Sequence, residues 1–275
     1  MRLSHEAPGS AARRFCTDAC LARCLRARGW DVARAAKLLR ATLAWREAFG
    51  VEALTWADVA QEGATGKTYR LRARDRRGRP VLCLAPGREN SRDHVGQIRH
   101  LVYAMETAVR AMAAGRAGPP RGAGADLAPE QLTLFVDFSN WSLRSAPGRK
   151  ATVETIHILQ EHYFERLGSA VVFNPPRVFA AFWAMVRPFL DARTAAKVTF
   201  LDARDPLRAR DVLASVFEDL SLLERSLGGD SPDEFDAHDY GARMRAEDEA
   251  QARANAAEVA AAQGTAAKHR ARRGA

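Results

Sequence analysis

The sequence predicts a mixed α/β fold in which a small helical module precedes a largely parallel sheet. Two observations carry this prediction: helical periodicity over residues 17–50, and a regular alternation of strand-like and helix-like segments over residues 132–201. Strands that alternate with helices lie parallel and are joined by right-handed crossovers. At 275 residues, 47% of them hydrophobic, the chain is long enough to bury a substantial core.

In the helical module, Asp31 is a suitable N-cap and Gly50 can end the helix that Asp31 begins. A stripe of apolar residues is expected to face the core: Val32, Ala36, Leu39 and Leu43. The segment "WADVAQEGATGK" continues the module with a short helix and a turn.

A hairpin follows, because the periodicity changes to two. Apolar residues alternate with arginines over residues 69–74, and the turn "RDRRGR" leads to a second strand, "PVLCLAP". The basic run over residues 67–79 can dock on anionic lipid headgroups, at about 1 kcal/mol per residue, or can protect a sheet edge against aggregation. We favour the second interpretation.

The remaining elements are assigned by period and by turn residues. Asn174 can cap a helix whose first turn contains Pro175, and residues 115–129 form a Gly- and Pro-rich surface loop. The tail is polar, Ala-rich and finally basic, and is expected to fray. Strands are predicted at residues 132–138, 170–173 and 198–201, and helices within "HVGQIRHLVYAMETAVRAM" and at residues 152–167, 175–190 and 212–227.

Composition limits the possible partners and compartments. The formal charge of +9 and the pI near 9.9 favour a negatively charged partner: nucleic acid, an anionic membrane or a phosphorylated ligand. Nucleic acid is disfavoured because aromatic residues are not interleaved with the basic ones. The start of the chain is too polar for a signal peptide, and the apolar run at residues 178–186 is shorter than the roughly 20 residues that span a bilayer. We therefore expect a cytoplasmic protein.

Several motifs for metal binding or catalysis are set aside. "QEGATGKT" lacks the strand–loop–helix context of a phosphate-binding loop, and His157, Glu161 and His162 do not have metallopeptidase spacing. No nucleophile elbow is visible, so we expect no enzyme, no metal and no cofactor. The cysteines lack zinc or disulfide spacing and are interpreted as core residues: Cys16, Cys20, Cys24 and Cys83.

Five stretches in order resemble the CRAL-TRIO lipid-binding family, whose best-known members are fungal secretory phosphatidylinositol-transfer proteins. They cover roughly residues 17–230: "LARCLRARGWDVARAAKLLRATLAWR", "RDRRGRPVLCLAPG", "LFVDFSNWS", "HYFERLGSAVVFNPPRVF" and "VRPFLDARTAAKVTFL". The chain departs from the family at Phe164, where Pro is usual, at Asn140, where Gly is frequent, and at Pro175, where Ala is frequent. Residues 115–129 resemble an insertion.

The resemblance implies three regions: an N-terminal helical module at residues 1–62, the lipid-binding domain at 63–230 and a tail at 231–275. In the family, the sheet floors an apolar pocket that holds one lipid, and a gate helix covers its mouth. Residues 175–190 match the gate, although a buried core helix would be equally apolar. The resemblance implies these gate and pocket-lining residues: Phe173, Val178, Phe179, Phe182, Trp183, Val186, Phe189 and Leu190.

The resemblance also implies a headgroup site. In phosphatidylinositol-binding members, a Glu, a Thr, a Lys and an Arg hold the inositol phosphate. The matching positions are Glu165, Thr194 and Lys197, with the arginine drawn from Arg23, Arg26 or Arg28. Each could singly be a solvated surface residue, but jointly they favour a headgroup site.

The expected function is lipid binding and transfer without chemistry. The expected partners are a phospholipid ligand, most of all a phosphoinositide, and an anionic membrane surface, met by a monomer that associates peripherally. Two alternatives stay open. The chain could carry another apolar molecule such as a retinoid or tocopherol, or it could be a lipid-sensing adaptor for a small GTPase or a lipid kinase.

Overall fold

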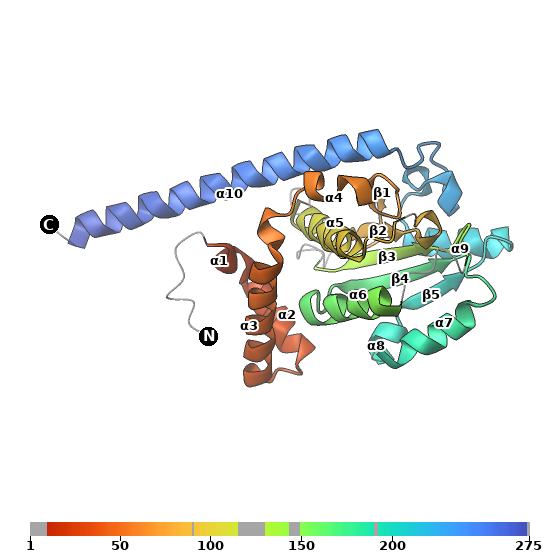
Figure 1. The fold of residues 1–275 in the computed structure, drawn as a ribbon, viewed down its shortest axis with the longest axis horizontal. Coiled ribbons are helices and arrows are strands. Elements are labelled where there is room, and N and C mark those ends of the chain that lie inside the picture. Colours follow the sequence, from red (N-terminus) through yellow and green to blue (C-terminus); the bar gives the residue numbers. More distant parts are fainter. Residues whose placement is uncertain (1–9, 90, 115–129, 143–148, 190–191, 274–275) are drawn as a thin grey trace. The chain divides into compact units, whose positions relative to one another are not determined.

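The computed structural model describes residues 10–89, 91–114, 130–142, 149–189 and 192–273 (Figure 1). The chain forms two compact units. One consists of residues 1–57 and 241–275, and the other of residues 58–240. The boundaries expected at 62/63 and 230/231 stay a prediction. The predicted surface loop at residues 115–129 lies outside the described residues.

The first unit is helical. It contains α1 (Ala11–Phe15), α2 (Asp18–Ala27), α3 (Val32–Phe49) and most of α10 (Ala237–Arg273). Asp31 caps α3 as predicted, because its Oδ1 accepts a hydrogen bond of 2.9 Å from the Arg34 N–H. Gly50 ends α3 with φ = 73°, in the left-handed region that glycine adopts without steric cost.

The core-facing stripe of α3 differs in phase from the prediction. Val32 is exposed, whereas the buried positions are Ala35, Leu38, Leu39, Thr42 and Arg46. The cation of Arg46 is tolerated there because its guanidinium lies 4.4 Å from the Phe15 ring centroid and pairs with Glu52 at 2.6 Å. Two polar residues, Thr42 and Arg46, lie on the core face, so a prediction based on apolar residues alone gave the wrong phase.

The tail is a helix, which corrects the expectation that it frays. α10 spans Ala237–Arg273, and alanine, its commonest residue, has the highest helix propensity. Near its start Met244 is fully buried, and the Asp248 carboxylate accepts a 2.7 Å hydrogen bond from the Trp56 N–H. The tail from Gly241 onwards is therefore part of the first unit.

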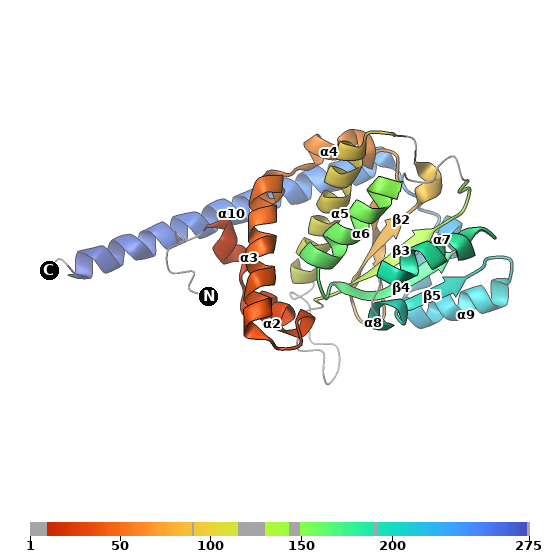
Figure 2. The same cartoon turned by 60° about the horizontal axis from the view of Figure 1, so that its bottom comes forward.

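The second unit is built on a five-stranded sheet, which confirms the predicted fold class (Figures 1 and 2). The strand order follows the sequence, with β1 antiparallel to β2 and the other pairs parallel. The strands are β1 (Thr68–Arg74), β2 (Pro80–Leu84), β3 (Leu132–Asp137), β4 (Leu167–Phe173) and β5 (Val198–Leu201). The helices are α4 (Trp56–Gly63), α5 (His94–Ala114), α6 (Arg149–His162), α7 (Phe179–Val186), α8 (Ala192–Ala195) and α9 (Pro206–Val216).

Three predicted helices have different limits. α6 ends at His162, and Leu167, expected to be its last residue, begins β4 instead. α9 begins at Pro206 behind an Asp205 cap and ends at Val216, eleven residues before the predicted end; 3₁₀ turns follow at Leu220–Leu222 and Arg225–Leu227. These turns keep apolar residues at helix-like spacing, which is why the sequence favoured one continuous helix.

Asn174 does not cap α7, contrary to the prediction. Its Oδ1 accepts from the Ala203 N–H at 2.8 Å, and its Nδ2 donates to Ser139 Oγ at 2.9 Å. The Asn174 side chain thus links the segments that follow β3, β4 and β5. α7 begins four residues later than predicted, at Phe179, and a 3₁₀ turn extends it over Arg187–Phe189.

The basic hairpin occupies a sheet edge, as favoured above, but much of its charge lies in the interior. Lys67 is buried between Glu62 and Glu89, and the Arg70 guanidinium donates to the Thr107 carbonyl at 2.9 Å. Arg79 is also buried. Three of the seven basic residues of the run therefore lie in the interior, whereas Arg72, Arg76 and Arg77 remain exposed.

All four cysteines lie in the described part of the chain and carry free thiols. Cys20, Cys24 and Cys83 are fully buried and Cys16 is partly buried, so the interpretation as core residues is confirmed. Burial raises the pKa of Cys83, which keeps its thiol protonated and unreactive. Among the described helices, none combines the length and apolarity needed to cross a bilayer.

Candidate functional site

One face of the sheet is apolar but incompletely covered. The strand register places two rows of paired residues on this face, here called the floor: Leu82, Leu134, Ala170 and Val198, then Leu84, Val136, Val172 and Phe200. All eight are apolar. Only Leu82, Ala170 and Val172 are buried; the others are partly exposed, and Phe200 is 41% exposed.

The opposite face is filled. Phe135 packs against Phe173 and Phe217, with ring centroids 5.5 Å and 6.1 Å apart. Only Thr199, on the edge strand, is exposed on this face. Ser169, paired with Thr133, is partly exposed, and these residues of the face are buried: Val81, Cys83, Thr133, Phe135, Asp137, Val171, Phe173 and Leu201.

Helices α5 and α7 lie over the floor. The floor side of β1 carries Arg70, which pairs with Leu82 and bonds to α5 through Thr107. From α7, Phe179 contacts Phe138 and Phe200 with centroids 4.9 Å and 5.7 Å apart, and Trp183 contacts Phe200 at 5.5 Å. α7 is thus attached to the floor by an aromatic cluster at one end.

Partly exposed aliphatic residues on a central strand are unusual beneath helices. Interiors are close-packed, and strands covered on both faces bury their side chains almost completely. β3 is the middle strand, yet Leu134 and Val136 are partly exposed while the alternate residues Thr133 and Phe135 are buried. The floor therefore offers apolar surface that the side chains described in the structure do not fill.

The predicted gate and lining residues have mixed outcomes. Phe179 is buried in the aromatic cluster, Trp183 is partly exposed, and Val178 is exposed just before α7. Phe173 lies on the face opposite the floor, where it packs against Phe135, and its place in the pocket lining stays a prediction. The side chains of Phe182, Val186 and Phe189, and residue Leu190 altogether, lie outside what the structure describes.

Two of the predicted headgroup residues precede neighbouring parallel strands, Glu165 before β4 and Lys197 before β5. Glu165 lies in the turn before β4 with φ = 57°, a left-handed conformation that is uncommon for a residue with a side chain. Lys197 precedes β5, and its Nζ donates to the Leu167 carbonyl at 2.7 Å, two residues beyond Glu165. Thr194 lies in α8, and its side chain is outside the described set.

The turn that holds Glu165 is fixed on both sides. Tyr163 donates from its hydroxyl to Glu106 Oε1 at 2.7 Å, and the Arg166 guanidinium donates to the Glu130 carbonyl at 2.8 Å. Such bonds hold a strained backbone in place. The Glu165 carboxylate is therefore presented from a rigid support.

The three candidate arginines lie in the first unit, on and just after α2. Arg23 is buried, Arg26 is exposed, and Arg28 is partly exposed with its Nη1 donating to the Ala27 carbonyl at 3.2 Å. Among them, Arg23 is the one held in a low-dielectric environment, where an ionic contact is strongest.

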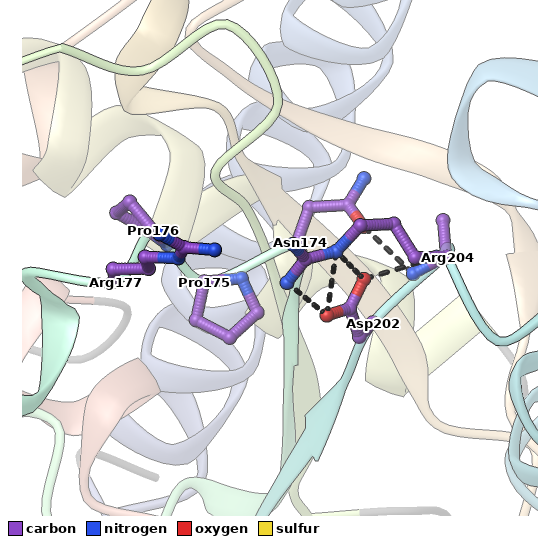
Figure 3. A pocket seen from close by; sticks show the side chains of 7 residues that line it. Asn174, Pro175, Pro176, Arg177, Asp202 and Arg204 are labelled. Carbon is purple, nitrogen blue, oxygen red and sulfur yellow. Dashed lines mark hydrogen bonds and ion pairs between the residues drawn. The ribbon is translucent and has the colours of Figure 1, made fainter.

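The carboxyl-terminal ends of β4 and β5 form a second feature, which the sequence reasoning missed. An open depression of about 410 Å³ is lined by Asn174, Pro175, Pro176, Arg177, Asp202, Ala203 and Arg204 (Figure 3). Arg204 holds Asp202 by hydrogen bonds of 2.5–3.0 Å and lowers the pKa of Asp202 to about 2. The sequence could have indicated this depression, because polar turns follow two adjacent parallel strands. Ligand sites of open α/β sheets lie at this end of the strands. The charged and amide side chains of the depression distinguish it from the floor, whose paired residues are all apolar.

Comparison with known proteins agrees with the fold. A model of the CRAL/TRIO domain matches residues 64–229. A CRAL-TRIO domain-containing protein of Schizosaccharomyces pombe is 38% identical over 205 residues, covering 74% of this chain and 19% of that protein. The phosphatidylinositol transfer protein PDR17 of Saccharomyces cerevisiae is 35% identical over 193 residues, covering 66% of this chain and 51% of that protein.

The chain thus spans about a fifth and about half of these two relatives. The crystal structure of Sfh5 superposes with a TM-score of 0.55 at 16% identity, over 66% of this chain and 62% of that one. At this identity the structural likeness concerns the fold alone.

Proposed function

The chain belongs to the CRAL/TRIO domain family, and on that premise we propose that it encloses one phospholipid above the floor and exchanges it at membranes. The similarity to a phosphatidylinositol transfer protein favours a phosphoinositide as the ligand. The exchange is binding and release, with no bond made or broken.

The observation that supports lipid binding is the difference between the two faces of the sheet. Two acyl chains contain roughly 30 methylenes at about 0.8 kcal/mol each, so their passage through water costs on the order of 20 kcal/mol. An apolar surface that the described side chains leave uncovered offsets this cost, and the floor is such a surface. Polar contacts, at about 1.5–3 kcal/mol each when charged, then select the headgroup.

Lys197 and Glu165 are the proposed selectors. An ammonium group can donate three hydrogen bonds, and the Leu167 carbonyl takes one, so Lys197 can still donate two to a phosphate. The Glu165 carboxylate can accept from inositol hydroxyls. Thr194, in the same unit, is the third member of the proposed set.

The test combines lipid identification with filling of the floor. The protein purified under native conditions should yield phospholipid by mass spectrometry and should transfer it between vesicles. Val136→Trp should keep the melting temperature close to wild type, because space is available, and should reduce bound lipid and transfer together.

Val171→Trp is the matched control. The two valines are neighbours on β3 and β4, but Val171 faces the filled side, so the larger ring should lower the melting temperature by overpacking. Absence of lipid from the wild-type protein, or a Val136→Trp variant as unstable as Val171→Trp, would show that the floor is packed solid.

A further inference from the structure

The connection between α2 and α3 presents a large apolar side chain to solvent. Trp30 is 65% exposed, and Val32, two residues later, is 71% exposed. Trp30 also has φ = 66°, and a left-handed backbone conformation is unfavourable for a bulky residue. Both exposure and strain thus oppose a tryptophan at this position on grounds of folding alone.

The connection is rigid. The Trp30 N–H donates to the Leu25 carbonyl at 2.7 Å, and Gly29, with φ = 61°, completes this closure of α2. One residue further on, Asp31 caps α3. In this type of helix ending, the residue in the position of Trp30 often packs back on its own helix, but here it remains exposed. We call residues 29–32 the tip.

The surroundings of the tip are strongly basic. Residues 21–40 contain six basic residues and one acidic residue, a net +5 of the +9 of the whole chain. Arg34, Lys37 and Arg40 are all exposed and follow the tip at three-residue spacing, so they lie on neighbouring positions of α3. The acidic residue, Asp31, is engaged by the α3 amide and by Arg34.

We propose that the tip is a membrane anchor that inserts Trp30 and Val32 between the headgroups of an anionic bilayer. Tryptophan prefers the interface between water and hydrocarbon, and lysine and arginine are attracted to anionic lipid. A rigid, strained tip loses little entropy on insertion, because its conformation is already fixed. The purpose of the anchor rests on the proposed lipid exchange, but its binding can be measured without transfer.

The test is sedimentation of the full chain with phosphatidylcholine vesicles with and without phosphatidylserine. The wild-type protein should bind the anionic vesicles, and this binding should weaken as salt is added. Trp30→Gly and Val32→Asp should each lower the affinity by about tenfold or more, as expected for removing one buried apolar side chain.

The Trp30→Gly variant separates anchoring from folding. Glycine adopts the left-handed conformation freely. The melting temperature of the variant should therefore equal or exceed that of wild type, while its vesicle binding falls. Val95→Asp is the matched control for Val32→Asp. Val95 is 66% exposed and also lies in the first turn of a helix, α5, in the other unit, and its variant should bind as wild type does.

The outcomes for the anchor and for the proposed function are distinct. If Trp30→Gly binds vesicles like wild type, or if Val95→Asp loses as much affinity as Val32→Asp, the anchor is refuted whatever lipid the protein carries. If wild type binds vesicles through the tip but never yields bound lipid, the anchor stands and the carrier function fails. Lipid content should be equal in Trp30→Gly and wild type.

Discussion

At the scale of single residues, Lys197 is the proposed selector of the lipid headgroup. Removing its ammonium group deletes charged hydrogen bonds to phosphate, so Lys197→Ala should lower phosphatidylinositol transfer by about tenfold or more. Transfer of a ligand without phosphate should change little. Lys150→Ala, which removes an exposed lysine from α6, is the matched control for vesicle transfer assays. Equal phosphatidylinositol transfer by both variants would remove Lys197 from the site and would favour a carrier of a different apolar molecule.

His100 makes stability depend on pH. It is buried in α5, and desolvation, together with the charge of Lys67, lowers its pKa from 6.5 to about 3. Between these pH values His100 is protonated in the unfolded chain and neutral in the folded protein. The free energy of unfolding should therefore decrease as pH falls from 6.5 towards 3. The slope approaches about 1.4 kcal/mol per pH unit for this one group.

Urea titrations across this pH range measure the effect. His100→Gln, which stays neutral, should show a smaller decrease than wild type over the same range. If the two pH profiles run parallel, His100 does not contribute to acid sensitivity.

At the scale of elements, the hairpin of β1 and β2 is secured by a buried carboxylate. Asp75 pairs with Arg79 at 2.5 Å and accepts from Thr133 Oγ1 at 2.7 Å. Asp75→Ala would leave the Arg79 charge buried and unpaired, so it should lower the free energy of unfolding by about 3–5 kcal/mol. Asp211→Ala, on the exposed surface of α9, should change it by less than about 0.5 kcal/mol. A small effect of Asp75→Ala in chemical denaturation would mean that Arg79 finds another partner.

The elements also show where sequence reasoning succeeds. Alternating side chains and clear turns located the hairpin and β5, and the Asp31 cap and Gly50 fixed α3. The Asn174 side chain was misassigned because the partners that it bonds, Ser139 and Ala203, are distant in sequence. The burial of Lys67 and Arg79 was missed for the same reason: alternation identifies a strand but does not reveal which charges have partners inside.

The candidate site was only partly predictable. Matched motifs gave Glu165 and Lys197, and the parallel topology explains why they share one end of the sheet. The choice of face was not predictable for Phe173, because every residue of "AVVF" in β4 is apolar and buried. The difference between floor and filled face emerges only when strands are paired in register.

At the scale of the whole molecule, the bound lipid should contribute to stability. A ligand that binds only the folded state stabilises it by RT ln(1 + [L]/Kd), or about 2.7 kcal/mol at a hundredfold excess over Kd. Protein stripped of lipid should therefore melt at a lower temperature than protein reloaded with phosphatidylinositol, in scanning calorimetry. Val136→Trp should reduce this difference. Identical melting of stripped and reloaded wild type would contradict enclosure of the lipid.

In the proposed function, the unfilled floor also affects the protein after it has released its lipid. An empty carrier exposes the apolar surface of the strands to water, which favours aggregation with other chains and proteolysis. The protein is then most prone to aggregation and proteolysis just after it releases the lipid. Such a protein is best emptied and refilled in one visit to a bilayer, so that unloading waits for a replacement.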